Sequence, residues 1–385
     1  MNRWPTKPLG ELLKVQNGFA FKSELFNNDR KGLPIIRIRD LARGFSETFY
    51  NGGYELEFEV ENGDFLIGMD GEFRCYRWQG GKALLNQRVC RLQNFSRDLD
   101  ASYVFYGINE HLRKIEDSTA FVTVKHLSSK QIAGIEMSVP PLLEQKRVVR
   151  LLDEADELRK LRVKADKHTS NLVPALFHEM FGDPVANPKG WPTKRAGELM
   201  AECDYGTSQK ANEEGRGVVV LRMGNVTNAG ELDLENLKTV VLPENELAKQ
   251  RLRAGDVLFN RTNSRELVGK TGMWDGRMEA VAASYFIRVR FRADVEHPQH
   301  FTTFMNLAAM KQRLAGMARG AVGQANINSK ELQAIELPVP LLPLQQEFAK
   351  RVMEIREFEA KQTASRQRLE SLFQSMLHKA FNGEL

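Results

Sequence analysis

Cysteine is scarce in this chain of 385 residues, which contains only Cys75, Cys90 and Cys203. Three cysteines without a metal-binding spacing exclude a disulfide framework and a cysteine-ligated metal site. An uninterrupted apolar run of about 18 residues, the minimum for a membrane span, is also missing. The first residues, 1–5, lack the apolar stretch of a signal peptide. We therefore expect a cytoplasmic protein that has no membrane contact.

Enzyme motifs are also missing. Gly269-Lys270-Thr271 looks like the end of a phosphate-binding loop, but Ser264 replaces the leading glycine of that motif. The only two histidines with a ligand spacing are His297 and His300, and their polar neighbours favour a solvated loop over a metal site. No nucleotide-cofactor fingerprint, Gly-x-Ser-x-Gly elbow or Asp/Asn-Pro-Pro-aromatic tetrapeptide is present. We expect a non-catalytic chain with no metal and no bound cofactor.

A strong charge of one sign is missing as well. Lysine and arginine number 55 against 50 acidic residues, which gives a net charge of +5 and an isoelectric point near 9.0. The excess is spread evenly, without a basic tail. Such a balance permits nucleic-acid binding but does not by itself argue for it.

Internal repetition is the strongest feature that is present. Short matches recur in the same order, at an offset that grows slowly from 187 to 200 residues. The pairs are Trp4-Pro5-Thr6-Lys7 with Trp191-Pro192-Thr193-Lys194, Gly10-Glu11-Leu12 with Gly197-Glu198-Leu199, Gly63-Asp64 with Gly255-Asp256, Ser129-Lys130 with Ser329-Lys330, and Val139-Pro140 with Val339-Pro340. Because chance would not keep five matches in order, we conclude that the chain is a tandem duplication with insertions in the second copy.

Each copy divides into a mixed part and a helical part, which predicts domains at 1–140 and 183–340 and helical spacers at 141–182 and 341–385. Short β-type runs bounded by turn residues predict strands at 34–38, 65–69, 218–223 and 257–259. Apolar periodicity predicts helices at 103–115 and 301–314. The fold class is therefore α+β.

The spacers carry apolar residues at steps of three and four, which predicts one apolar stripe on each helix. Its members are Leu151, Leu152, Ala155, Leu158, Leu161, Ala165, Leu172 and Leu176 in the first spacer, and Phe348, Val352, Ile355, Phe358, Leu369, Leu372, Phe373 and Met376 in the second. Pro174 should kink the first helix, and Gly182 and Gly383 should end the two.

A helix of about 39 residues is roughly 58 Å long, too long to pack on a domain whose radius of gyration is ~14 Å. We expect the two stripes to pair with each other. The chain order domain, helix, domain, helix then makes the pair an antiparallel coiled coil, with approximate two-fold symmetry between two similar domains.

Two polar segments that follow the matching Gly-Asp strands suggest contact with double-stranded DNA. Arginine and lysine suit phosphates and guanine edges, and asparagine suits adenine edges. We expect the two segments to be equivalent loops with different tips, which would read different half-sites. The candidate residues are Arg74, Tyr76, Arg77, Lys82 and, further along, Arg88 in the first copy, and Arg261, Asn263, Ser264, Arg265 and Lys270 in the second. An ordinary solvated loop is the alternative for either segment.

These features resemble the specificity subunit of type I restriction–modification systems. The likeness rests on three segments. The first is residues 135–145, which begin Ile135-Glu136 and end Glu144-Gln145. The second is Ile335-Glu336-Leu337-Pro338-Val339-Pro340 followed by Leu344-Gln345-Gln346-Glu347, and the third is the terminal Phe381-Asn382-Gly383-Glu384-Leu385. The resemblance covers the whole chain.

The resemblance implies two target-recognition domains that read the halves of a bipartite, asymmetric DNA sequence. It also implies that the chain docks two methyltransferase (M) subunits and restriction/translocase (R) subunits. S-adenosylmethionine, the donor for methylation of adenine N6, would bind the methyltransferase partner and not this chain. The family's base-contacting residues vary, so none is carried over to positions here.

Two alternatives stay open at this point. A non-catalytic scaffold with two protein-binding domains on a coiled-coil strut fits the low charge of each domain. An enzyme with an unrecognised site, such as a nuclease, would cleave DNA alone with Mg²⁺, and the missing motifs make it the weakest hypothesis.

Overall fold

The computed structural model describes residues 4–118, 125–318 and 325–385. Residues 1–3, 119–124 and 319–324 lie outside the described residues. The first range belongs to the N-terminal stretch expected to lack a leader, and the other two are short segments of the expected domains. The chain forms two compact units, residues 1–163 with 364–385 and residues 164–363. None of the described helices is both long and apolar enough to cross a membrane.

Unit 1 contains a four-stranded sheet of order β2-β10-β7-β8, a five-stranded sheet of order β3-β5-β4-β9-β6, and the small pair β1-β11. The strands are β1 (Thr6–Pro8), β2 (Lys14–Asn17), β3 (Phe26–Asn27), β4 (Leu33–Ile36), β5 (Phe49–Tyr50), β6 (Glu59–Val60), β7 (Phe65–Gly68), β8 (Cys75–Arg77), β9 (Ala83–Leu85), β10 (Val89–Gln93) and β11 (Glu136–Ser138). The strands predicted at 34–38 and 65–69 correspond to β4 and β7, except that the chain after Ile36 turns into α1 (Ile38–Leu41).

One long helix covers the four-stranded sheet of unit 1. Helix α2 (Ala101–Ser118) contains the predicted 103–115 and buries Tyr103, Val104, Ile108 and Leu112. The short α3 (Ser129–Ala133) begins at Ser128, whose hydroxyl accepts a hydrogen bond from the Gln131 N–H and so caps the helix. Three 3₁₀ turns complete the unit: Leu9–Glu11, Ser23–Leu25 and Leu56–Phe58.

Unit 2 repeats this plan with its own insertions. Its sheets have the orders β13-β20-β16-β18, β15-β14-β19, β12-β22 and β17-β21. The strands are β12 (Thr193–Arg195), β13 (Met200–Tyr205), β14 (Val218–Leu221), β15 (Lys238–Val240), β16 (Val257–Asn260), β17 (Thr262–Asn263), β18 (Thr271–Met273), β19 (Ala280–Ala282), β20 (Phe286–Phe291), β21 (Ala325–Asn326) and β22 (Glu336–Pro338). The runs predicted at 218–223 and 257–259 form β14 and β16.

The helix predicted at 301–314 is wrong as a single element. It is divided between α8 (Pro298–Asn306) and α9 (Ala308–Met317), because Leu307 adopts an extended backbone with ψ 145°. The remaining short helices are α6 (Ala196–Leu199), α7 (Glu244–Gln250), α10 (Ser329–Gln333) and a 3₁₀ turn at Met223–Asn225.

Two of the repeated sequence motifs connect the beginning of each domain to its end. The Val139 N–H donates to the Pro5 carbonyl at 2.8 Å, and the Val339 N–H donates to the Pro192 carbonyl at the same distance. Strand β1 pairs with β11 as β12 pairs with β22. The repeated Trp-Pro-Thr-Lys and Val-Pro motifs are therefore the ones that join the two ends of each domain.

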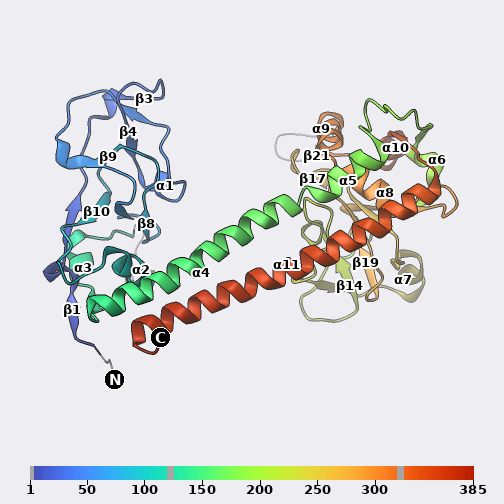
Figure 1. Cartoon of the computed structure of the whole chain (residues 1–385). Coiled ribbons are helices and arrows are strands. Elements are labelled where there is room, and N and C mark those ends of the chain that lie inside the picture. The colour runs from blue at the N-terminus through green and yellow to red at the C-terminus, as the bar shows by residue number, and fades with distance from the viewer. Residues whose placement is uncertain (1–3, 119–124, 319–324) are drawn as a thin grey trace. The chain divides into compact units, whose positions relative to one another are not determined.

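The long helices follow directly after these closures. They are α4 (Leu142–Thr169), α5 (Leu172–Phe181) and α11 (Leu342–Asn382), and both α4 and α11 contribute to both units (Figure 1). The predicted kink at Pro174 is a full break at residues 170–171, because proline cannot donate to the carbonyl of residue 170 and its ring clashes there. Gly182 and Gly383, with φ of 83° and 76°, follow the helix ends as expected.

The helices pair in antiparallel fashion within each unit. In unit 1, Arg159 Nη2 lies 2.6 Å from Glu370 Oε2, and the Arg159 guanidinium lies 4.1 Å from the centre of the Phe373 ring. In unit 2, the Thr169 hydroxyl donates to Gln362 Oε1 at 2.8 Å. Residue numbers thus increase along α4 while the residue numbers of the contacting positions on α11 decrease, as in an antiparallel pair.

The seam differs from the apolar stripe that the sequence predicted. Leu158, Leu161 and Phe358 are 55%, 53% and 51% exposed, so these members of the stripe are on the outside. The buried positions near the middle of the helices are the polar Thr169 and Gln362. The prediction was wrong there because paired polar groups replace leucines at the contact.

Candidate nucleic-acid interface

Two hairpins of the same geometry mark corresponding places in the two units. In β7–β8, Leu66 faces Tyr76, and in β16–β18, Leu258 faces Gly272. The residue after each second strand is a fully buried tryptophan, Trp78 or Trp274. The loops between the hairpin strands are therefore equivalent, and they comprise residues 69–74 and 261–270.

This register corrects the prediction that segments 74–82 and 260–270 are equivalent loops. Only Arg74 lies in the hairpin loop of unit 1. Tyr76 and Arg77 belong to strand β8, and Lys82 follows Trp78 beyond the opposite end of that strand. The sequence match ended at the glycine-aspartate turn, so the different loop lengths behind it could not be aligned.

Most cations of the predicted first segment are used inside unit 1. The Arg77 guanidinium lies 5.4 and 5.2 Å from the rings of Phe65 and Phe105 and donates to the Ser102 hydroxyl. Lys82 Nζ lies 2.6 Å from a Glu59 carboxylate oxygen. Tyr76 is half-buried, and burial raises the pKa of its hydroxyl.

Lys270 is the clearest structural cation of unit 2. Its side chain is buried, and its ammonium donates to the carbonyls of Met223 at 3.0 Å and Val226 at 2.7 Å. Burial lowers the pKa of Lys270. This placement does not support the DNA contact predicted from the charge of Lys270.

Arg261 remains available at a polar corner of unit 2. Its guanidinium lies 4.6 Å from the centre of the Tyr205 ring, and its Nη2 donates to Asn326 Oδ1 at 3.2 Å. The Tyr205 hydroxyl is hydrogen-bonded to Ser329, which lowers the pKa of Tyr205. Tyr205 and Tyr285 are 41% and 43% exposed. The corner thus offers an arginine held over an aromatic ring and a second accessible ring.

The other candidates of the second loop lie beside Arg261. Asn263 is half-buried and donates to Asn260 Oδ1 at 3.2 Å. Ser264 is half-buried and Arg265 is exposed. Arg265 is thus the most accessible cation among the predicted residues of this loop.

Unit 1 has an equivalent corner with different side chains. The Met69 N–H donates to the Arg88 carbonyl, as the Arg261 N–H donates to that of Tyr285. Arg88 is therefore the counterpart of Tyr285. Its side chain is 58% exposed, and its φ of 71° is the left-handed conformation that few arginines adopt.

An acid and a histidine accompany Arg88. Asp70 Oδ1 lies 2.7 Å from His126 Nδ1 and 3.6 Å from Arg88 Nη1, and the Asn17 amide donates to the Ser129 hydroxyl at 3.3 Å. Sequence reasoning missed Asn17, Asp70, His126, Tyr205, Tyr285 and Asn326. The signal that could have found two of them is the repeated Ser-Lys motif, since His126 and Asn326 both stand three residues before its serine.

The histidine pair of unit 2 does not form the solvated loop that was expected. His297 caps α8, with its Nδ1 accepting from the Gln299 N–H, and His300 is buried 2.7 Å from Glu296. The prediction was wrong because both residues belong to the start of a helix that packs against α5. Among the described residues, no cluster of three or more His, Cys, Asp or Glu side chains could hold a metal ion.

Comparison with known families also finds two copies of one domain in the chain. The family model for the type I restriction modification DNA specificity domain matches residues 1–165 and again residues 188–370. The chain belongs to this family.

Individual relatives match along nearly the whole chain. The type I restriction enzyme EcoBI specificity subunit of Escherichia coli is 26% identical over 99% of this chain and 86% of its own length. The EcoKI specificity subunit of Escherichia coli strain K12 is 24% identical over 99% and 89%. The crystal structure of the S subunit from M. genitalium shares the fold with a TM-score of 0.59 at 14% identity, covering 99% of this chain and 96% of the other.

Proposed function

We propose that this chain is the DNA-recognition subunit of a type I restriction–modification complex and reads a bipartite target, one half with each unit. The observation that carries the proposal is the pair of equivalent corners with unlike side chains. At matching backbone positions, unit 1 presents Asn17, Arg88 and His126, and unit 2 presents Tyr205, Tyr285 and Asn326. Arg261 stands where unit 1 has Met69, next to Asp70. Two copies with different tips suit two different half-sites.

The chemistry of the second corner suits base reading. A guanidinium held on an aromatic face loses little conformational entropy when it binds, and its fork can donate twice to guanine O6 and N7. Arg265 beside it suits a phosphate contact. In the first corner, Arg88 supplies the cation, while Asp70 and Asn17 add an acceptor and an amide that can select among bases.

The long helices supply the surface for the partner subunits in this proposal. Leu161 and Val163 in unit 1 and Leu172 and Phe358 in unit 2 are apolar and exposed on the helices. In unit 2, Leu172, Ile355 and Phe358 line a shallow pocket edged by Arg351 and Glu354. Such apolar strips with charged edges fit helices of two methyltransferase subunits. Those subunits would bind S-adenosylmethionine and carry out the methylation. Restriction/translocase subunits would complete the complex.

Arg261→Ala tests the DNA proposal. In the complex assembled with its methyltransferase subunits, loss of a base-reading arginine should weaken binding to the target by about 10- to 100-fold. Binding to unrelated DNA should change little. Fluorescence anisotropy at several salt concentrations measures both affinities.

Two matched variants make this experiment decisive. Arg261→Lys keeps the charge but loses the planar fork, so it should behave like the alanine variant on the target. Lys249→Ala removes an exposed cation elsewhere on unit 2 and should bind normally. If Arg261→Ala also bound the target normally, the second corner would not be the reading site.

A further inference from the structure

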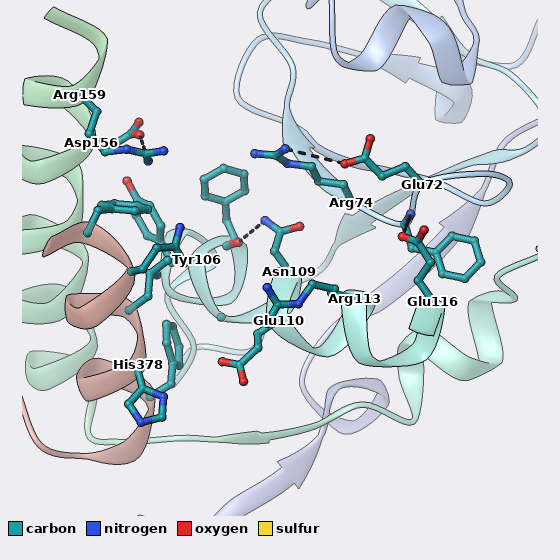
Figure 2. Close-up of a pocket in the computed structure, with 17 residues that line it drawn as sticks. Glu72, Arg74, Tyr106, Asn109, Glu110, Arg113, Glu116, Asp156, Arg159 and His378 are labelled. Atoms are coloured by element: carbon teal, nitrogen blue, oxygen red, sulfur yellow. Dashed lines mark hydrogen bonds and ion pairs between the residues drawn. The ribbon is translucent and has the colours of Figure 1, made fainter. Parts of the chain in front are cut away.

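Unit 1 has an open groove of about 530 Å³ between helix α2, the loop before β8, the middle of α4 and the C-terminal part of α11 (Figure 2). Arg74, Asn109, Arg113 and Asp156 are among the side chains that line it. Figure 2 shows these side chains reaching toward one space from separate elements. The groove contains both signs of charge.

The same place in unit 2 is occupied by the chain itself. Four contacts hold the loop 226–233 there. Lys270 donates to the Val226 carbonyl, and Lys311 donates to the Asn228 carbonyl. Gly230 lies directly on the Asn306 amide, and Glu231 forms an ion pair with Arg356. A Cβ on Gly230 would be only 2.4 Å from the Asn306 Nδ2 atom, so this close approach requires glycine.

Arg74 and Asn109 have matching positions in the two units. Arg74 and Lys270 each immediately precede the second hairpin strand. Asn109 Oδ1 accepts the Cys75 N–H at 2.8 Å, as Asn306 Oδ1 accepts the Thr271 N–H at 3.3 Å.

A third pair of matching positions, on the long helices, carries opposite charges in the two units. Asp156 pairs with Arg159 on α4, whereas Arg356 pairs with Glu359 on α11, at the same spacing along the helix. Asp156 also pairs with Lys160, at 2.9 Å. Asp156 therefore occupies in unit 1 the position that Arg356 occupies in unit 2.

The corresponding connection of unit 1 folds elsewhere. Between β4 and β5 the chain turns back on its own sheet, where the Ile35 N–H donates to the Thr48 carbonyl and the Ser46 hydroxyl donates to that of Ile35. The Arg74 side chain is 59% exposed; its guanidinium lies 3.9 Å from a Glu72 carboxylate oxygen and 5.6 Å from the centre of the Tyr76 ring. Among the described residues, Arg113 has no hydrogen-bond or ion-pair partner.

We propose that this groove binds a turn-forming segment of a partner protein, in the manner that loop 226–233 occupies unit 2, where the Thr227 N–H donates to the Glu231 carbonyl and closes the turn. The segment places a glycine on Asn109 and turns backbone carbonyls toward Arg74 and Arg113. It carries a basic side chain beside Asp156, because Asp156 has the opposite charge to Arg356. The carboxylates of Glu72, Glu110 and Asp156 in the lining disfavour a nucleic-acid phosphate.

Two synthetic peptides test the proposal without DNA, so the result is independent of the proposed DNA function. One has the sequence of residues 225–235, and the other carries Glu231→Arg. Binding to the full chain is measured at peptide concentrations up to the millimolar range by fluorescence anisotropy. The arginine peptide should bind about fivefold more tightly, as expected for one exposed ion pair.

Variants of the chain locate the site. Asp156→Arg should reverse the preference in favour of the glutamate peptide, whereas Glu157→Arg, an exposed change on the next residue, should not. Arg74→Ala should weaken both peptides alike, because its contacts are to backbone carbonyls. Equal binding of the two peptides, no binding by either, or displacement of the peptide by double-stranded DNA would overturn the proposal.

Discussion

At the residue scale, neighbouring cations of one loop have opposite roles. Arg261 and Lys270 both follow strand β16, yet one lies on an exposed tyrosine and the other is buried against two carbonyls. Sequence reasoning assigned DNA contacts to both, because charge and loop position are local properties. Burial depends on where loop 226–233 folds, which no local pattern encodes.

Lys270→Ala should therefore lower stability rather than impair DNA recognition. The change leaves the carbonyls of Met223 and Val226 without their donor, and an unsatisfied buried polar group costs about 1–3 kcal/mol. Chemical denaturation measures the free energy of unfolding, with the exposed Lys249→Ala as the control. A normal stability together with a loss of target binding would instead restore Lys270 as a DNA contact.

The buried thiols make a prediction about pH. Burial raises the pKa of Cys90 to about 12 and raises the pKa of Cys75 as well, against an unfolded value of about 8.5. Above pH 8.5 the unfolded chain loses thiol protons that the folded chain keeps. Each thiol should therefore lower the free energy of unfolding by roughly 1.4 kcal/mol per pH unit above about pH 9.

Urea denaturation between pH 8 and pH 10 measures this slope. The double variant Cys75→Ala and Cys90→Ala should show a shallower decline than the native chain, whatever its stability at neutral pH. Cys203→Ala is the comparison variant: Cys203 is only half-buried and burial raises its pKa as well, so its loss should change the slope less than the loss of the two buried thiols. Equal slopes in the native chain and the double variant would contradict the burial of the two thiols.

At the element scale, one glutamine at the start of each long helix joins it to its domain. Gln345 is fully buried, its Oε1 accepts the His297 N–H at 2.8 Å, and its amide donates to the Pro340 carbonyl at 2.8 Å. Gln145 makes the same contacts with the Asp100 N–H and the Pro140 carbonyl. This geometry gives a physical reason for the glutamine in the phrase that carried the family resemblance.

Gln345→Leu should destabilise the chain by about 2–4 kcal/mol, because it leaves a backbone donor and an acceptor unpaired inside the protein. The neighbouring Gln346 is exposed, so Gln346→Leu should change stability by less than about 0.5 kcal/mol. Thermal unfolding followed by circular dichroism compares the two. Similar melting temperatures for both variants would show that Gln345 does not join the helix to its domain.

The helices also show how far periodicity can predict an element. Their existence, their ends at Gly182 and Gly383 and their antiparallel pairing follow from spacing and chain order. The seam positions did not, because the sequence argument counted apolar residues only. Thr169 and Gln362 pair with each other, and Leu158 and Phe358 are left outside, where a partner can cover them.

At the scale of the whole molecule, duplication explains both what repeats and what differs. The closures at Pro5–Val139 and Pro192–Val339 and the hairpins with buried tryptophans are shared. The reading corners and the groove beside α2 are not shared, because insertions such as loop 226–233 fill space in one unit only. Sequence comparison within the chain could therefore find the scaffold but could not align the loops that we propose to contact DNA.

Base-resolved footprinting of the assembled complex on its methylated target tests whether each unit reads one half-site. We expect two short protected blocks separated by an unread spacer, and Arg261→Ala should remove base contacts in one block while leaving the other intact. One continuous protected block, or loss of contacts in both blocks, would contradict the assignment of one half-site to each unit.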